Sequence, residues 1–168
     1  MWWSRQSVKI IPIAALLVVS LLTACGFRLQ GTDDYPASMA STYIDAEDRY
    51  TQFYRDLRVA LEQGGLTIAP SPINADAIIR IERDATGQEV LTISTRNVPT
   101  EYDVFYTVRY SVWINGEEVM PSRTLSLSQD YTFDETQVLG KKREAENIRK
   151  VLSADLVRQV RHELSRLE

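Results

Sequence analysis

The segment from Tyr102 to Ile114 constrains the fold more than any other part of the chain. Apolar or aromatic side chains occupy every second position along it, which is the period of a β-strand that buries one face. Asn115-Gly116 follows directly, and this dipeptide is a strong signal for a two-residue hairpin turn. We therefore expect a second strand, from about Val119 to Phe133, to return antiparallel beside the first.

Two large aromatic side chains, Phe105 and Trp113, fall on the other face of the 102–114 strand. If helices cover the face that carries Tyr106 and Tyr110, then Phe105 and Trp113 lie on a face that no helix covers. We predict a partner interface at these two residues, because an uncovered apolar surface is typical of a contact site. The alternative is that a loop or the N-terminal segment covers them.

Helical periodicity marks two further elements. The apolar positions of the first are Tyr50, Phe53, Tyr54, Leu57 and Leu61. Asp48 is its expected N-cap, and Gly64-Gly65 is its expected end. The second helix runs from about Glu144 to Leu167, and its start could lie one or two turns earlier. The apolar stripe of the second helix consists of Ile148, Val151, Leu152, Leu156, Val160, Leu164 and Leu167.

Two more strand segments complete the pattern. A short strand is expected from Ser38 to Ile44, before the first helix. The region from Asp76 to Ser94 is also rich in strand-forming residues, but Asp84-Ala85-Thr86-Gly87 interrupts it. That interruption fits either a hairpin or a bulge in one long strand. Pro70 and Pro72 predict a loop before this region.

The order of elements is therefore β-α-β-β-β-α, which predicts an α+β fold. The economical packing is a four-stranded mixed sheet with two helices packed on one face. The first β-α-β unit gives a parallel crossover, and the later strands are antiparallel. We assign residues 38–168 to this single α/β sandwich domain.

The N-terminal residues have the parts of a bacterial lipoprotein signal peptide. Residues 1–9 carry two basic residues and no acidic one, and the apolar run from Ile10 to Leu22 is shorter than the roughly 20 residues of a membrane-spanning helix. Leu22-Thr23-Ala24-Cys25 resembles a lipobox, in which small residues precede the cut and the cysteine thiol receives the lipid. We predict that residues 1–24 are removed and that Cys25 is lipidated.

Residues 25–37 are polar and contain Gly and Pro, so we predict a lipidated N-terminal tether. Gly26 follows the predicted lipidation site, and this residue favours sorting to the outer membrane in enteric bacteria. Several acyl chains on one cysteine hold a protein at a bilayer far more firmly than the single chain that gives marginal binding.

Charge and cysteine content narrow the possible partners. The 168-residue chain has 19 Lys and Arg and 23 Asp and Glu; Arg5 and Lys9 lie in the predicted leader, so the mature part is acidic by six charges. This balance argues against general nucleic-acid binding. Cys25 is the only cysteine, so an internal disulfide and a thiolate metal cluster are excluded.

The sequence has none of the residue patterns expected of an enzyme. It contains no Gly-rich phosphate loop, H-E-x-x-H or G-x-S-x-G pattern. His162 is the only histidine and falls on the polar flank of the last helix. The acidic cluster Asp45, Glu47 and Asp48 fits a solvated loop that favours the start of the following helix better than a metal site. We expect no catalysis, no cofactor and no metal.

Two basic features stand out against the acidic whole. Arg96 lies in a turn between two strands, and Lys141-Lys142-Arg143 lies near the start of the last helix. Each fits an ordinary solvated charge. A local basic cluster is also where an anionic ligand would dock, since Arg forms forked hydrogen bonds to phosphate and Lys acts as a point charge.

The mature start, Cys25-Gly26-Phe27-Arg28-Leu29, resembles the opening of the LptE family of lipopolysaccharide-assembly lipoproteins. The resemblance extends in order and spacing over almost all of the mature chain. Its further parts are Leu61 to Gly65, Arg96-Asn97 followed by Glu101-Tyr102, the long Tyr/Val strand, Asp134-x-x-Gln137 and Leu139-Gly140-Lys141.

The resemblance implies a lipid-anchored protein on the periplasmic side of the outer membrane. Such proteins plug the large LptD β-barrel, assist its assembly and bind lipopolysaccharide during its insertion into the outer leaflet. The matching lipopolysaccharide-binding positions are Arg96 and Lys141; Lys142 is added here as a basic neighbour without a clear family counterpart. The alternative function is an auxiliary outer-membrane lipoprotein of a lipid ABC-transport system.

Overall fold

The computed structural model describes residues 35–167. Its strands and helices are β1 (Ser41–Ala46), α2 (Gln52–Gln63), β2 (Thr67–Ile68), β3 (Ala77–Ile93), β4 (Pro99–Ile114), β5 (Glu117–Thr132) and α3 (Val138–Leu164). Three short 3-10 helices are η1 (Ala37–Met39), η2 (Pro72–Asn74) and η3 (Glu135–Gln137). The predicted signal peptide, Cys25 and most of the predicted tether lie outside the described residues. Within 35–167, no helix has the length and apolar character needed to span a bilayer.

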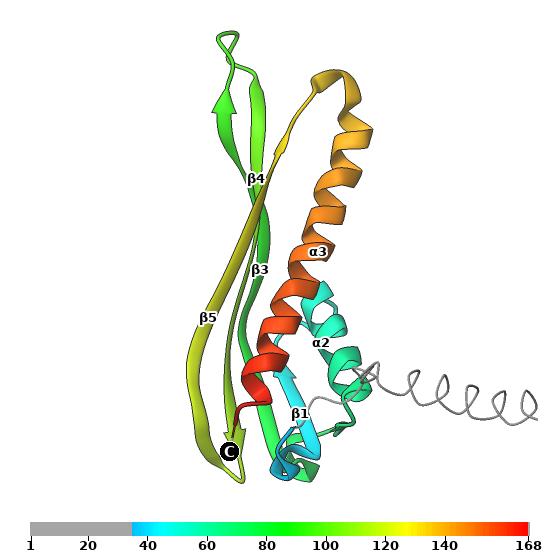
Figure 1. The fold of residues 1–168 in the computed structure, drawn as a ribbon, viewed down its shortest axis with the longest axis vertical. Helices are drawn as coiled ribbons and strands as arrows, with labels where there is room; N and C mark the ends of the chain where they lie inside the picture. The colour runs from blue at the N-terminus through cyan, green and yellow to red at the C-terminus, as the bar shows by residue number, and fades with distance from the viewer. Residues whose placement is uncertain (1–34, 168) are drawn as a thin grey trace, which may run out of the picture. The chain divides into compact units, whose positions relative to one another are not determined.

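The sheet has five strands in the order β2-β1-β3-β4-β5 (Figure 1). The predicted parallel crossover is confirmed, because β1 pairs in parallel with β3 across α2. The predicted number of four strands was wrong, because Thr67 and Ile68 form a short strand that pairs in parallel with the start of β1. A strand of two residues has no periodicity, and the two prolines that follow indicated a loop.

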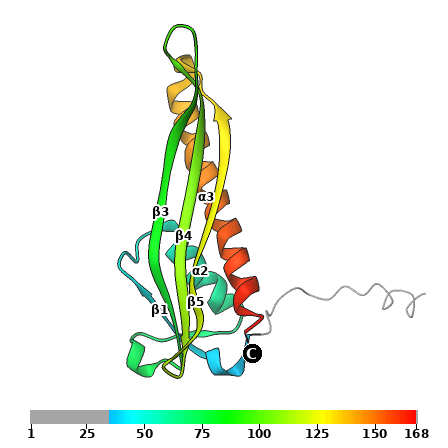
Figure 2. The ribbon, with the colours of Figure 1, turned by 90° about the vertical axis from the view of Figure 1, so that its left-hand side faces the viewer.

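Both helices cover one face of the sheet, as predicted, and lie behind it in Figure 2. The apolar face of β4 supplies much of the core, which includes Val104, Tyr106, Val108, Tyr110 and Val112. The helices supply Phe53, Leu57, Leu61, Ile148, Leu152, Leu156, Val160 and Leu164. Two predicted core positions were wrong, because Tyr50 precedes α2 and is 86% exposed, and Val151 is 52% exposed.

The ends of α2 follow from local hydrogen bonds. The N-cap is Thr51, whose side chain accepts a hydrogen bond from Tyr54 N; the prediction of Asp48 was wrong. Asp48 instead accepts a bond of 2.7 Å from Tyr50 N and forms the turn before the helix. The predicted glycine stop is confirmed, because Gly65 has a φ of +94°, which favours glycine.

The other boundaries differ from prediction by a few residues. The first residues of the strand expected from Ser38 belong to η1, and β1 begins at Ser41. α3 begins at Val138, about two turns before Glu144. The hairpin at Asn115-Gly116 is confirmed, with φ angles of 51° and 84° that match a two-residue turn.

The interruption from Asp84 to Gly87 is neither a hairpin nor a bulge. β3 is continuous, and these residues pair in regular register with Val108 to Phe105. The bulge lies earlier in the strand, at Glu82. Ile81 pairs with Tyr110 and Arg83 pairs with Arg109, so Glu82 is the extra residue. One extra residue reverses which side chains face the helices. Asp84 therefore occupies the helix-covered face that Ile81 occupies before the bulge.

Tyr35 joins the start of the described chain to the C-terminal ends of both helices. Its ring lies against the backbone of Gly64, where an added Cβ would be 2.5 Å from Tyr35 Cε2. Arg161 Nε in the last turns of α3 donates to the Tyr35 hydroxyl at 3.3 Å. This end of the domain lies opposite the β3–β4 turn (Figure 1).

Gly87 creates the space in which the Phe105 ring lies across β3. A Cβ at position 87 would lie 2.6 Å from Phe105 Cζ. We expect Gly87→Ala to displace the ring and lower the free energy of unfolding by about 1–3 kcal/mol, the usual cost of overpacking. Urea unfolding followed by tryptophan fluorescence measures this change.

Gly140→Ala in α3 is the matched control, because nothing lies within 4 Å of its added Cβ. We expect this variant to raise the free energy of unfolding by up to about 1 kcal/mol, since Ala favours a helix more than Gly does. In a Phe105→Ala background, Gly87→Ala should lose most of its cost. An unchanged cost in that background would contradict the contact.

Candidate functional site

Two of the predicted basic segments lie at the same end of the domain. The β3–β4 turn with Arg96 and the first turns of α3 both occupy the upper end in Figures 1 and 2. The turn is closed by a hydrogen bond of 2.8 Å from Ser94 N to Val98 O, and Asn97 has a φ of 60°. Arg96 is exposed at its apex. We call Arg96, Lys141 and Lys142 the basic tip.

The two lysines of the basic tip have different surroundings. Lys141 is half-buried; its Nζ lies 2.9 Å from Glu144 Oε2 and 6.0 Å from the ring centroid of Tyr131. Lys142 is exposed. Arg96 and Lys142 therefore present their charges to solvent, whereas the ammonium group of Lys141 is held against the sheet.

The acidic cluster before α2 is used in local structure. Asp45 Oδ2 lies 3.1 Å from Arg80 Nε, and Asp48 closes the turn at Tyr50. Among residues 35–167, no group of three or more His, Cys, Asp and Glu side chains is arranged to hold a metal ion.

The sheet face that the helices leave uncovered is mostly polar. Hydroxyl side chains line neighbouring strands on it, and Thr107 and Ser126 form a cross-strand hydrogen bond of 2.7 Å. The two predicted contact residues on this face, Phe105 and Trp113, are half-buried. Phe105 lies over Gly87, and the Arg80 guanidinium lies 5.7 Å from the Trp113 ring. The face is therefore a polar surface with two aromatic contacts rather than the apolar surface expected from the sequence.

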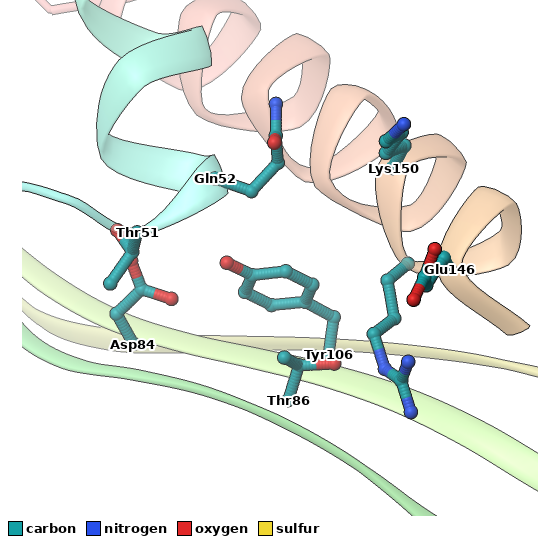
Figure 3. Close-up of a pocket in the computed structure, with 8 residues that line it drawn as sticks. Thr51, Gln52, Asp84, Thr86, Tyr106, Glu146 and Lys150 are labelled. Carbon is teal, nitrogen blue, oxygen red and sulfur yellow. The ribbon is translucent and has the colours of Figure 1, made fainter. Parts of the chain in front are cut away.

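A pocket of about 330 Å³ lies between the start of α2, strands β3 and β4, and α3 (Figure 3). We call it the central pocket. Its lining residues are Thr51, Gln52, Asp84, Thr86, Tyr106, Glu146, Arg149 and Lys150. The Tyr106 ring lies in the middle of the view, with its hydroxyl directed towards Asp84 and Thr51.

Asp84 is the most perturbed acid of the central pocket. Its Oδ2 atom is buried and has no hydrogen-bond partner within the described part of the chain. Burial raises the pKa of the Asp84 carboxyl above its ordinary value, and the negative charge of Asp48 adds to this; the hydroxyls of Thr51 and Tyr106 act in the opposite direction. Burial likewise raises the pKa of the Tyr106 hydroxyl, which accepts a hydrogen bond of 3.2 Å from Phe53 N.

Sequence reasoning missed the central pocket for a structural reason. The alternation of β3 would place Asp84 on the uncovered face with Arg80 and Glu82, and only the bulge at Glu82 brings it inward. The available signal was the break in apolar alternation after Ile81, which indicated an irregularity but not its position or direction.

The sequence profile of the LptE family, described as lipopolysaccharide-assembly, matches residues 39–164. This chain belongs to the LptE family. The match confirms the resemblance expected from the spaced motifs between Leu61 and Lys141. The family description names an assembly role rather than a chemical reaction.

Similar sequences and similar solved folds extend over most of the chain. The LPS-assembly lipoprotein LptE of Yersinia enterocolitica is 26% identical over 153 residues, covering 90% of this chain and 73% of that protein. A lipoprotein B from Nitrosomonas europaea has a similar solved fold, with a TM-score of 0.69 and 23% identity over 83% of this chain and 90% of that chain. The rare lipoprotein B of Shewanella oneidensis has a TM-score of 0.65 and 20% identity, over 74% of this chain and 93% of that chain.

The raised pKa of Asp84 predicts a pH-dependent effect of Asp84→Asn. The fold disfavours the ionised carboxylate relative to the unfolded chain, so the wild type loses stability as the pH rises from the ordinary carboxyl value of 3.8 through the higher folded value. Asp84→Asn should therefore raise the free energy of unfolding at about pH 7, and the difference should shrink at about pH 2.5, where the carboxyl is almost fully protonated in both states. Urea unfolding at the two pH values measures this difference.

Glu89→Gln is the matched control, since Glu89 is an exposed acid on the same strand. This variant should leave the free energy of unfolding nearly unchanged at about pH 7. If Asp84→Asn is less stable than the wild type at that pH, the fold stabilises the ionised carboxylate. That result would contradict the expectation that burial disfavours the charge.

Proposed function

We propose that this chain is a non-catalytic, lipid-anchored subunit of the outer-membrane lipopolysaccharide translocon. In this role it occupies the lumen of the LptD β-barrel, assists the assembly of that barrel, and binds lipopolysaccharide during insertion into the outer leaflet. The observation that carries the proposal is the match of residues 39–164 to the LptE family. The Yersinia relative is named as an LPS-assembly lipoprotein, in line with the same role.

The proposed membrane attachment rests on the N-terminal sequence. The apolar leader ending in Leu22-Thr23-Ala24-Cys25 supplies the pattern for cleavage and lipidation, and Gly26 favours the outer membrane. A lipid on Cys25 would hold the domain on the periplasmic side, next to both a membrane-embedded partner and a lipid ligand.

The basic tip supplies the chemistry for recognising lipopolysaccharide phosphates. Arg96 and Lys142 are exposed cations at one end of an otherwise acidic domain, and Lys141 lies beside them on α3. A guanidinium group can form two parallel hydrogen bonds to a phosphate, and an ammonium group adds charge without a fixed direction. Such contacts favour an anionic lipid head without requiring a deep pocket.

The uncovered sheet face supplies a surface suited to the interior of a barrel. The lumen of a transmembrane β-barrel is polar, unlike its lipid-facing side. The hydroxyl side chains around Thr107 and Ser126 can hydrogen-bond to such a wall, while Phe105 and Trp113 offer two half-buried aromatic contacts. We therefore place the partner interface at Phe105 and Trp113 within a polar contact rather than an apolar one.

The double variant Arg96→Asp with Lys141→Asp should weaken lipopolysaccharide binding by about tenfold or more. Each substitution removes a cation that can form a charge-assisted hydrogen bond, a contact of about 1.5–3 kcal/mol, and adds a repelling carboxylate. Binding of purified lipopolysaccharide to the full-length protein in detergent measures the change. The variant should still co-purify with the barrel.

The control is Arg58→Asp with Arg166→Asp, which changes the charge equally at exposed positions away from the basic tip. It should bind lipopolysaccharide within about twofold of the wild type, since exposed charges more than a Debye length from a ligand are largely screened. Equal binding by both double variants would remove the basic tip from the proposed site.

A photoreactive phenylalanine analogue at Phe105 or Trp113 should form an adduct with the barrel protein in intact cells. Both substitutions keep an aromatic side chain on the uncovered face. Electrophoresis and mass spectrometry identify the partner. The same analogue at Val59, an exposed residue of α2, compares the helix side. Barrel adducts from Val59 with none from the two aromatic positions would place the contact on the helix side.

A further inference from the structure

We propose that the central pocket binds an acyl chain that carries a hydroxyl group close to an anionic head. The lipid part of lipopolysaccharide has this chemistry, and in this respect the inference rests on the proposed function. The pocket is nevertheless separate from the basic tip, and its own side chains select the ligand class.

The first requirement comes from Asp84. Its Oδ2 atom is shielded from solvent and has no hydrogen-bond partner within residues 35–167. A buried acceptor of this kind costs free energy until a donor reaches it. The Thr51 and Tyr106 hydroxyls lie on the same side of the pocket, but neither hydrogen-bonds to Oδ2 (Figure 3). The ligand should therefore bring a hydrogen-bond donor, such as a hydroxyl group, to this end of the pocket.

The second requirement comes from the middle of the pocket. The accessible lining is mostly carbon, although most of the lining residues are polar or charged. The Tyr106 ring, the methyl group of Thr86 and the aliphatic stems of the α3 side chains supply this carbon surface (Figure 3). At about 330 Å³, the pocket lies at the lower end of the range for small-molecule sites. It suits a hydrocarbon segment rather than a sugar ring rich in hydroxyls.

The third requirement comes from the α3 side of the pocket. Arg149 and Lys150 place two cations there, against one acid, Glu146. Arg149 is held in place because its Nη2 donates to Gln88 Oε1 on β3 at 3.1 Å. Cations at this position favour an anionic head and oppose a ligand amine. A hydroxyl donor, a hydrocarbon segment and an anionic group together define a hydroxylated acyl chain with a phosphate or carboxylate nearby.

A photoreactive 3-hydroxytetradecanoyl probe tests this proposal on the full-length acylated protein in phospholipid nanodiscs. Mass spectrometry of the labelled peptides should place the adducts on β3, β4 and α3 around Asp84, Tyr106 and Lys150. Free 3-hydroxytetradecanoate should compete about tenfold better than tetradecanoate, because only the former donates a hydrogen bond to the carboxylate. Equal competition would show that the hydroxyl group is not recognised, and labels elsewhere would show that the acyl chain does not enter the pocket. Either result would overturn the proposal.

Substitutions at Asp84 test the same contact without changing the ligand. Asp84→Leu removes the acceptor and should abolish the preference for the hydroxylated competitor. Asp84→Asn keeps a neutral carbonyl acceptor of the same shape and should retain a smaller preference, of about threefold. Glu89→Gln should keep the full preference. A full preference in Asp84→Leu would contradict the assigned role of the carboxylate.

Two further arms separate this inference from the function proposed above. Arg96→Asp with Lys141→Asp should keep pocket labelling, so loss of lipopolysaccharide binding at the basic tip and loss of pocket binding are distinguishable. Competition by purified lipid A and by the free hydroxy acid identifies the source of the chain. Stronger competition by lipid A assigns the chain to the glycolipid, and the reverse assigns it to a free hydroxy acid; both support the pocket.

Discussion

The pairing of β4 on both sides is the interaction on which the rest of this fold depends. β4 forms antiparallel hydrogen-bonded pairs with β3 on one side and with β5 on the other, over nearly its whole length. Its alternating side chains then give one face to the helices, where Tyr106 and Tyr110 are almost fully buried. Both phenolic hydroxyls are hydrogen-bonded in this core. Phe53 N donates to the Tyr106 hydroxyl, and the Tyr110 hydroxyl donates to Glu163 at 2.7 Å.

The bulge at Glu82 determines what the two faces of β3 can do. Before it, Ala77, Ile79 and Ile81 extend the apolar core. After it, the same face presents Asp84 and Thr86 beneath the helices, while Gly87 on the other face makes room for Phe105. Because of this one extra residue, β3 contributes Asp84 and Thr86 to the lining of the central pocket.

Sequence periodicity predicted the parts of the fold that have long, regular elements. Alternation predicted the 102–114 strand, and helical spacing predicted both helices. The Asn115-Gly116 turn and the parallel crossover followed from a turn dipeptide and from the order of these elements, and both are confirmed. β2 was missed because two residues cannot show a period, and the N-cap was assigned to Asp48 because Asp48 and Thr51 are both good capping residues in sequence. Val151 illustrates a further limit, since an apolar residue at the edge of a helical stripe can remain exposed.

The candidate site was less accessible to such reasoning. The basic tip could be anticipated because Arg96 lies in a turn and Lys141 and Lys142 lie at a helix start, and those local positions are confirmed by the fold. Their shared place at one end of the domain depends on the lengths of β3, β4 and α3 together. The central pocket depends on tertiary contacts between four elements, and the inward orientation of Asp84 required a register shift that propensities do not encode.

The packing of Tyr35 fixes the start of the described chain at one end of α3. Tyr35 contacts Gly64 and Arg161, whereas Lys141 lies 20 residues earlier on the same helix, which corresponds to about 30 Å along its axis. The described part of the chain therefore begins at the opposite end of α3 from this lysine. α3 acts as a rigid spacer, and its length sets the separation between Tyr35 and the basic tip.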